Sequence, residues 1–145
     1  MYHQTGQEDY DRVKKGYEAA GVQHEVFPFT DHMEKYYHLS DVVISRSGAT
    51  TIFELAYFRK AAILVPYPFA AGQHQKTNAL QVESLGGAYV VENDQLSGEK
   101  LHGLLKGLMD NPSRAKEMGE KVGRLYVEDA AERMINGIVY GSERV

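Results

Sequence analysis

The sequence predicts an α/β fold, a Rossmann-like parallel sheet with helices on both faces, and two observations support this. Short apolar segments alternate along the chain with longer segments whose apolar residues recur at helical spacing. Strands that alternate with helices imply right-handed crossovers between parallel strands. The length of 145 residues, 43% of them hydrophobic, is enough for one core, so one domain is expected.

The first forty residues predict two strands and two helices. "MYHQTG" looks like the end of a strand whose preceding βα unit is absent. Residues 7–20 predict a helix with acids in its first turn, where the helix dipole favours them, and Gly21 ends it. Its apolar stripe consists of Tyr10, Val13, Tyr17 and Ala20. A strand over 24–29 and a helix over 31–38 follow.

The rest of the chain continues the alternation. Short apolar runs bounded by turn residues predict strands over 41–45, 61–66 and 88–91. Helical spacing predicts helices over 49–58, 73–85, 97–109, 112–122 and 129–140. Leu85, Gly86 and Gly87 together are typical of a helix C-cap.

Composition excludes several classes of protein. The net charge of −4 and the lack of a clustered basic face argue against a nucleic-acid partner. The chain has no cysteine, so disulfide frameworks and thiolate metal sites are excluded and a reducing, cytoplasmic location is expected. No apolar run is long enough to span a bilayer, and the N-terminus lacks the pattern of a signal peptide.

The first candidate ligand site is residues 45–51, between a predicted strand and a helix. Ligands of open parallel sheets bind beyond the carboxyl ends of the strands. Ser47 is expected to be the N-cap, and Gly48 has no Cβ, so an anion can approach the N–H groups of Gly48, Ala49 and Thr50. This would seat a diphosphate without a basic cluster. A serine and glycine before a helix also serve as an ordinary cap.

Glu54 extends this candidate site along the same helix. It lies six residues beyond Gly48, or about 9 Å along the axis at 1.5 Å per residue. A carboxylate there can accept hydrogen bonds from two sugar hydroxyls, so the spacing suits the diphosphate and ribose of a nucleotide. A single glutamate on a helix can also simply face solvent.

The stretch "PYPFAAGQHQKTNAL" forms a second candidate site. Pro66 ends a strand at the same edge of the sheet, and polar residues cluster at the start of the next helix. These are Gln73, His74, Gln75 and Asn78. Amide and imidazole groups can bind the hydroxyl and acyl groups of a neutral sugar. The alternative is a polar first turn with Asn78 facing solvent.

The motifs "SRSGATTIFELA", "ILVPYPFAAGQHQKTNAL" and "LGGAYVV" resemble the donor-nucleotide half of a bacterial glycosyltransferase family. This is the MurG family of N-acetylglucosaminyltransferases, glycosyltransferase family 28. "HQTG" and "FTDHMEKYYHLSDVVISRSG" fit the same family in order, so the resemblance covers nearly the whole chain. It implies a partial C-terminal domain of the two-domain GT-B fold. It also implies transfer of N-acetylglucosamine from UDP to undecaprenyl-linked lipid I, giving lipid II for peptidoglycan, with no metal or other cofactor.

Carried over by position, the resemblance assigns roles to ten residues. It assigns diphosphate binding to the backbone of Gly48, Ala49 and Thr50, and binding of the ribose hydroxyls to Glu54. The remaining residues are Thr30 and Met33 for the uracil, Ser47 in the signature motif, His74 and Gln75 for the sugar and its phosphate, and Asn78 in the same motif. Arg46 belongs to the motif too, and the sequence leaves open whether it contacts ligand or braces the loop.

The resemblance also predicts which parts of a complete family member lie outside this sequence. The acceptor domain, the first βα unit of the donor domain and the catalytic base are expected outside this sequence, so the chain alone is predicted to be inactive. Membrane attachment, at the cytoplasmic face of the inner membrane, would depend on the absent domain. A strand edge left unpaired would favour dimers.

Several alternatives compete with this family. A separate donor-binding subunit of a two-component transferase and a UDP-sugar epimerase of the same fold both stay open, as does an interaction module without a ligand. Asp9, Tyr10 and Asp11 resemble a metal-binding D-x-D motif, but positions i and i+2 of a helix do not face each other. The six histidines include no i,i+4 pair, so no metal site is expected.

Overall fold

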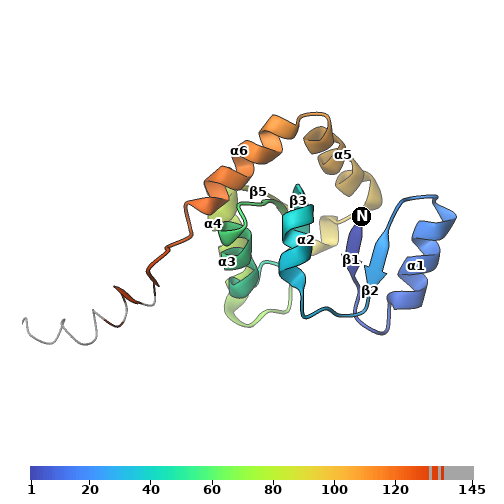
Figure 1. The fold of residues 1–145 in the computed structure, drawn as a ribbon, viewed down its shortest axis with the longest axis horizontal. Coiled ribbons are helices and arrows are strands. Elements are labelled where there is room, and N and C mark those ends of the chain that lie inside the picture. The colour runs from blue at the N-terminus through green and yellow to red at the C-terminus, as the bar shows by residue number, and fades with distance from the viewer. Residues whose placement is uncertain (131, 134, 136–145) are drawn as a thin grey trace, which may run out of the picture. The chain divides into compact units, whose positions relative to one another are not determined.

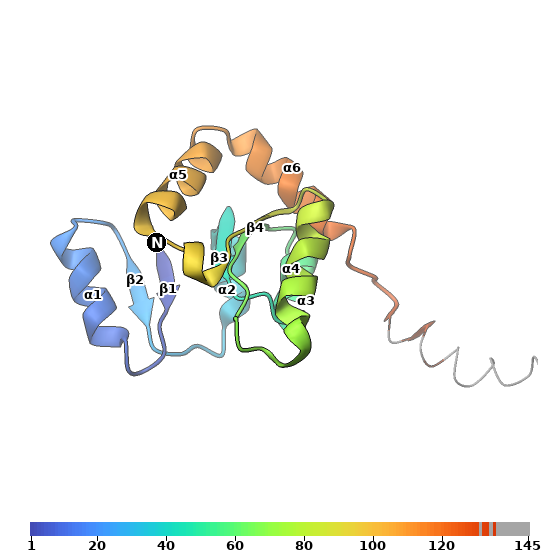
Figure 2. The same ribbon diagram turned by 180° about the vertical axis from the view of Figure 1, so that it is seen from behind.

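The computed structural model describes residues 1–130, 132–133 and 135, which divide into two compact units. The first is Met1–Ser40 and the second begins at Asp41. The predicted helix over 129–140 falls largely on residues outside this description. Each unit is an α/β arrangement with parallel strands, as Figures 1 and 2 show from opposite sides, so the predicted fold class is confirmed. The sequence predicted a single sheet, whereas the strands form two sheets, one in each unit.

The first unit places one helix on each face of a two-stranded sheet. Its elements are β1 (Tyr2–Gln4), α1 (Tyr10–Ala19), β2 (Glu25–Phe27) and α2 (Met33–Leu39). Side chains alternate between the faces of a strand. Tyr36 of α2 stacks on Phe27, with ring centroids 4.4 Å apart, whereas Tyr17 of α1 meets His3 from the other face. Aromatic contacts therefore hold both helices to the sheet.

The second unit is built on three parallel strands in the order β3-β4-β5. Its elements are β3 (Val42–Ser45), α3 (Ala49–Tyr57), β4 (Ala61–Leu64), the short helix η1 (Ala71–Gln73), α4 (His74–Ser84), β5 (Ala88–Val90), the short helix η2 (Asn93–Gln95), α5 (Gly98–Met109) and α6 (Pro112–Gly123). The helices and strands agree with the predicted segments to within a few residues. Every residue of the central strand β4 is buried, as expected for a parallel strand covered on both faces.

The alternation of β4 divides the core of this unit into two layers. Ala61 packs with residues of α5 and α6, and Ile63 packs with Val65, Val91 and the partly buried leucines of α5. Ala62 and Leu64 point to the other face, and both are fully buried. Helices α3 and α4 contact each other in this unit, and α6 contacts β4.

Two tight turns fix the ends of helices in the second unit. Gly86 has a φ of 73° and ends α4, which confirms the predicted C-cap. Arg59 ends α3 in the same left-handed region, with a φ of 51°. A Cβ on Gly119 of α6 would lie 2.1 Å from the Arg59 carbonyl oxygen, so only glycine allows α6 to approach this turn so closely.

Candidate functional site

The start of α3 lies directly beyond the carboxyl end of β3. Gly48 is the N-cap, with an extended backbone, and its carbonyl accepts the first helical hydrogen bond from the Ile52 N–H at 3.0 Å. The first N–H groups of a helix have no acceptor within the helix. Ala49 and Thr50 are exposed, and the first turn carries no acidic residue. This terminus therefore offers N–H donors to an anion.

Ser47 does not cap α3, and the sequence prediction was wrong on this point. It is fully buried, and its Oγ donates to the Gln75 carbonyl oxygen at 2.7 Å. Asn78 also faces inward, because its Nδ2 donates to the Ser47 carbonyl oxygen at 3.1 Å. The alternative that Asn78 faces solvent is therefore wrong as well. These two bonds tie the start of α3 to the start of α4.

Gln75 extends this connection to the loop after β4. Its Oε1 accepts a hydrogen bond from the Tyr67 N–H at 2.9 Å. We call Ser47, Gln75 and Asn78 the clamp. The hydrogen bonds of the clamp hold the N-termini of α3 and α4 together at the carboxyl edge of the sheet.

Arg46 braces the protein, which answers the question that the sequence left open. Its Nη1 donates to the carbonyl oxygens of Val65 and Pro66, each at 3.1 Å, and to Asn93 Oδ1 at 2.9 Å. Its guanidinium also lies 5.5 Å from the centre of the Tyr67 ring. One side chain thus joins the segments that follow all three strands. The sequence hinted at this only by placing an arginine directly after an apolar strand.

A second link beside the clamp is an ion pair on the side of α4. Lys76 Nζ lies 2.7 Å from Glu92 Oε1, just after β5. The hydrogen bond and charge of Glu92 raise the pKa of Lys76. The positive charge of Lys76 therefore has an acidic partner already within the protein.

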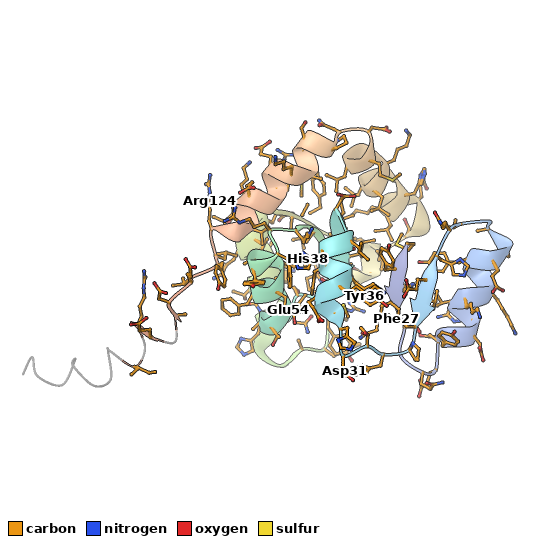
Figure 3. All side chains as sticks on the ribbon, viewed as in Figure 1. Phe27, Asp31, Tyr36, His38, Glu54 and Arg124 are labelled. Carbon is orange, nitrogen blue, oxygen red and sulfur yellow. The ribbon has the colours of Figure 1, made fainter. Side chains whose placement is uncertain are left out.

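Glu54 is half-buried on α3 and is labelled in Figure 3. Its carboxylate follows the helix N-terminus by nearly two turns, the spacing expected from the sequence. His74, the first residue of α4, is exposed. The preceding residue, Gln73, has a φ of 54°, unusual for a residue other than glycine.

Eight of the ten predicted site residues lie in the second unit. They are Ser47, Gly48, Ala49, Thr50, Glu54, His74, Gln75 and Asn78. Thr30 and Met33 belong to the first unit, where Thr30 Oγ1 accepts a hydrogen bond from the His32 N–H at 3.0 Å and Met33 begins α2. His3 of that unit lies 3.1 Å, through Nδ1, from the Tyr17 hydroxyl oxygen.

One buried polar atom at this edge is unexplained by the protein's own contacts. Ser45 Oγ, at the end of β3, has no hydrogen-bond partner among the described residues. Such atoms are uncommon in folded proteins. Within the same residues, no group of three acidic or histidine side chains is placed to hold a metal ion. Nor does any described helix have the length and apolar character needed to cross a bilayer.

Comparison with known proteins adds independent observations. A curated relative from Myxococcus xanthus is 41% identical over 132 residues, which is 91% of this chain but 34% of the relative. A relative from Geobacter sulfurreducens is 36% identical over 142 residues, or 98% of this chain and 39% of the relative. Both are named UDP-N-acetylglucosamine–N-acetylmuramyl-(pentapeptide) pyrophosphoryl-undecaprenol N-acetylglucosamine transferase. The chain therefore spans a little over one third of these relatives.

Solved structures agree with the sequence matches. The crystal structure of Acinetobacter baumannii MurG superposes with a TM-score of 0.86 at 31% identity, covering 93% of this chain and 41% of that one. The glycosyltransferase VinC, solved with dTDP, has a TM-score of 0.66 at 18% identity and shares the fold. The family model described as the glycosyltransferase family 28 C-terminal domain matches residues 1–134. The chain therefore belongs to the glycosyltransferase family 28 C-terminal domain family.

Proposed function

We propose that this chain binds UDP-N-acetylglucosamine as the donor domain of a transferase that converts lipid I to lipid II. The names of its relatives support this reaction. The observation that carries it is the start of α3, where N–H groups that have no acceptor within the helix are followed, nearly two turns later, by Glu54. The named relatives do not favour a two-component subunit or an epimerase.

The diphosphate is assigned to the backbone N–H groups of Gly48, Ala49 and Thr50. Gly48 has an ordinary φ of −62°, and a Cβ there would meet nothing nearer than Thr51 Oγ1 at 4.0 Å. Neither the backbone nor the packing of the protein therefore requires glycine. A ligand that approaches the backbone would require it, because a Cβ would occupy the space in front of the N–H groups.

The sugars are assigned to side chains on α3 and α4. Glu54 accepts hydrogen bonds from the ribose hydroxyls, since a carboxylate can accept from both. His74 and the amide of Gln75 bind the N-acetylglucosamine and its phosphate, while the uracil is bound by backbone groups near Thr30 and Met33. Ser47 and Asn78 act by positioning, because their side chains donate hydrogen bonds within the clamp.

Calorimetric titration with UDP-N-acetylglucosamine tests this assignment. Glu54→Gln keeps the shape of the side chain but removes its charge. We expect binding to weaken by about 1 to 3 kcal/mol, the usual scale for a hydrogen bond to a charged group. Glu99→Gln, an exposed position on α5, is the matched control and should not change the affinity. Unchanged binding by Glu54→Gln would refute the ribose assignment.

The transfer itself is assigned to the longer protein. The relatives are almost three times as long as the matched segment, so the acceptor site and the catalytic base are placed outside these residues. No metal or other cofactor is part of the proposal. Incubation of this chain with UDP-N-acetylglucosamine and lipid I should give no lipid II, and turnover would contradict this.

We also place the longer protein in the cytoplasm, peripherally on the inner face of the membrane where its lipid acceptor lies. In isolation, the chain is proposed to dimerise by strand pairing. β1 and β3 each pair with one strand among the described residues, so each has a second edge with unpaired N–H and C=O groups. Sedimentation at increasing concentration should detect a dimer; a monomer throughout the range would contradict the proposal.

A further inference from the structure

The loop between β4 and α4 carries two aromatic side chains that the fold leaves open. Phe69 is 82% exposed, more than any other large apolar side chain among the described residues. Tyr67 is 47% exposed, and the two rings meet edge to face with their centroids 5.7 Å apart and their planes at 74°. A single exposed apolar side chain is ordinary in a protein. Two aromatic rings in contact instead form a surface.

The backbone around Phe69 is a hydrogen-bonded turn. The Ala70 N–H donates to the Tyr67 carbonyl oxygen at 3.2 Å, so Pro68 and Phe69 occupy the centre of a β-turn. Proline holds its own φ near the value that the first central position requires. The Gln73 N–H then donates to the Ala70 carbonyl oxygen at 3.2 Å, which joins the turn to the start of α4. Phe69 therefore needs little ordering of its backbone when a ligand binds.

Tyr67 is held from two sides. Its N–H donates to Gln75 Oε1 at 2.9 Å, and the Arg46 guanidinium lies 5.5 Å from the centre of its ring. Gln75 is part of the clamp, so the bonds that join α3 and α4 also hold the aromatic pair. The amide oxygen of Gln75 is occupied by this contact, which leaves its amide nitrogen to donate to a ligand.

The chemistry of this loop suits a sugar. The two rings adjoin Gln75, and His74 precedes it at the start of α4. Apolar aromatic walls with a few directional polar groups are typical of sites for small ligands. A pyranose of the glucose type has C–H groups on both faces and hydroxyls at its edge, so it can use both kinds of group at once. The uracil is assigned to other residues, so the ring left for this loop is N-acetylglucosamine.

We propose that Phe69, supported by Tyr67, is a specificity-determining residue that packs against the apolar face of the donor's N-acetylglucosamine. This rests on the proposed function, because the sugar is brought to this loop by a diphosphate bound at the start of α3. The polar assignments to His74 and Gln75 fix the hydroxyl and amide groups of the sugar. Phe69 adds the apolar contact, which the ring and the acetyl methyl group can both make.

Calorimetric titration of Phe69→Ala with two ligands tests the proposal. UDP-N-acetylglucosamine should bind roughly three- to tenfold more weakly than to the wild type, because the apolar contact is lost. The affinity for UDP should not change, because UDP lacks this sugar. Phe69→Tyr keeps the ring and should bind both ligands as the wild type does. Unchanged affinity of Phe69→Ala for UDP-N-acetylglucosamine would overturn the proposal, and so would an equal loss for UDP, which would place the contact at the nucleotide.

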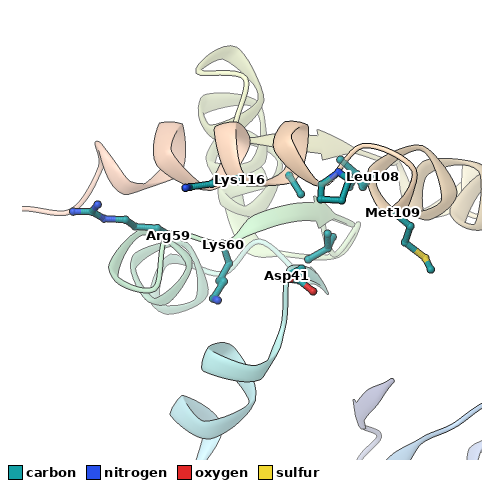
Figure 4. Close-up of a pocket in the computed structure, with 9 residues that line it drawn as sticks. Asp41, Arg59, Lys60, Leu108, Met109 and Lys116 are labelled. Carbon is teal, nitrogen blue, oxygen red and sulfur yellow. The ribbon is translucent and has the colours of Figure 1, made fainter.

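Met109→Ala is the matched control. Met109 is 75% exposed and borders a hollow of about 530 Å³ at the start of β3, the end of the strand opposite to the candidate site (Figure 4). This variant should bind both ligands as the wild type does. If it loses as much affinity for UDP-N-acetylglucosamine as Phe69→Ala, the effect is not local and the proposal fails. Absence of binding of either ligand by the wild type would instead refute the proposed function, and this inference with it.

Discussion

Ser47 shows how one buried hydroxyl can position two helices. It donates to the Gln75 carbonyl oxygen across 28 positions of sequence and, through its own carbonyl, accepts from Asn78. Removing a buried donor leaves its acceptor without a hydrogen bond or water, and this costs more than a surface hydrogen bond contributes. The contribution of Ser47 can therefore be measured as a change in the free energy of unfolding.

At this residue, Ser47→Ala should lower the free energy of unfolding by about 1 to 3 kcal/mol, because the Gln75 carbonyl loses its donor. Denaturant titration measures the change. Ser84→Ala is the matched control, because the Ser84 hydroxyl also donates to a backbone carbonyl, that of Gln81, but in an exposed place. The control should change stability by less than about 0.5 kcal/mol. Equal losses for the two variants would argue against the clamp.

His3 gives a second prediction at the scale of one residue. Burial lowers its pKa from 6.5, and the charge of Asp9 opposes this shift more weakly. Above pH 6.5 the imidazole is mostly neutral in both states. As the pH falls below 6.5, the unfolded chain binds the proton more readily than the folded one, so stability should fall.

Proton NMR of the His3 ring should therefore titrate below pH 6.5 in the folded protein. Replacing this residue by glutamine should reduce the loss of stability between pH 6.5 and 5. A titration midpoint above 6.5 would contradict the assignment of burial as the dominant cause.

Among the helices, α6 depends on close approach to its neighbours more than on its own helix propensity. Gly119 sits over the Arg59 carbonyl, where any side chain would collide with backbone that cannot easily shift. Gly107, on α5, has nothing within 4 Å of a Cβ built there. Packing therefore requires glycine at position 119 but not at position 107, so an alanine substitution should have different effects on stability at the two positions.

Gly119→Ala should destabilise the protein by about 2 to 4 kcal/mol, because α6 must move away from the turn and the buried contacts of Met118 loosen. Gly107→Ala should instead stabilise it by about 0.5 to 1 kcal/mol, through higher helix propensity. Thermal unfolding of both variants measures the difference. A neutral result at position 119 would mean that α6 does not pack against Arg59 as described.

In the whole molecule, the buried apolar side chains are distributed unevenly. Of the buried hydrophobic residues described, Tyr37 alone belongs to the first unit, and the others lie in the second. Stability follows buried apolar contacts, so regions with few of them open more readily. The first unit should be the less stable part of the chain.

Hydrogen exchange followed by mass spectrometry tests this difference between the units. Amides of β1 and β2 should exchange faster than those of β4, whose residues are all buried. Peptides from the second unit provide the internal control. Equal protection of the two sheets would show that the chain opens as one cooperative body.

The sequence by itself determined the order and type of the strands and longer helices up to residue 123, the helix start at Ala49 and the spacing to Glu54. These features are local: periodicity, turn residues and a rise of about 1.5 Å per residue suffice to predict them. Only the tertiary structure decided that Ser47 is buried rather than a cap, that Asn78 points inward and that Arg46 is a brace. Their partners lie far along the chain, as with the 47 positions between Arg46 and Asn93. A local pattern carries no information on which distant carbonyl a side chain will reach, because that depends on how the strands and helices pack.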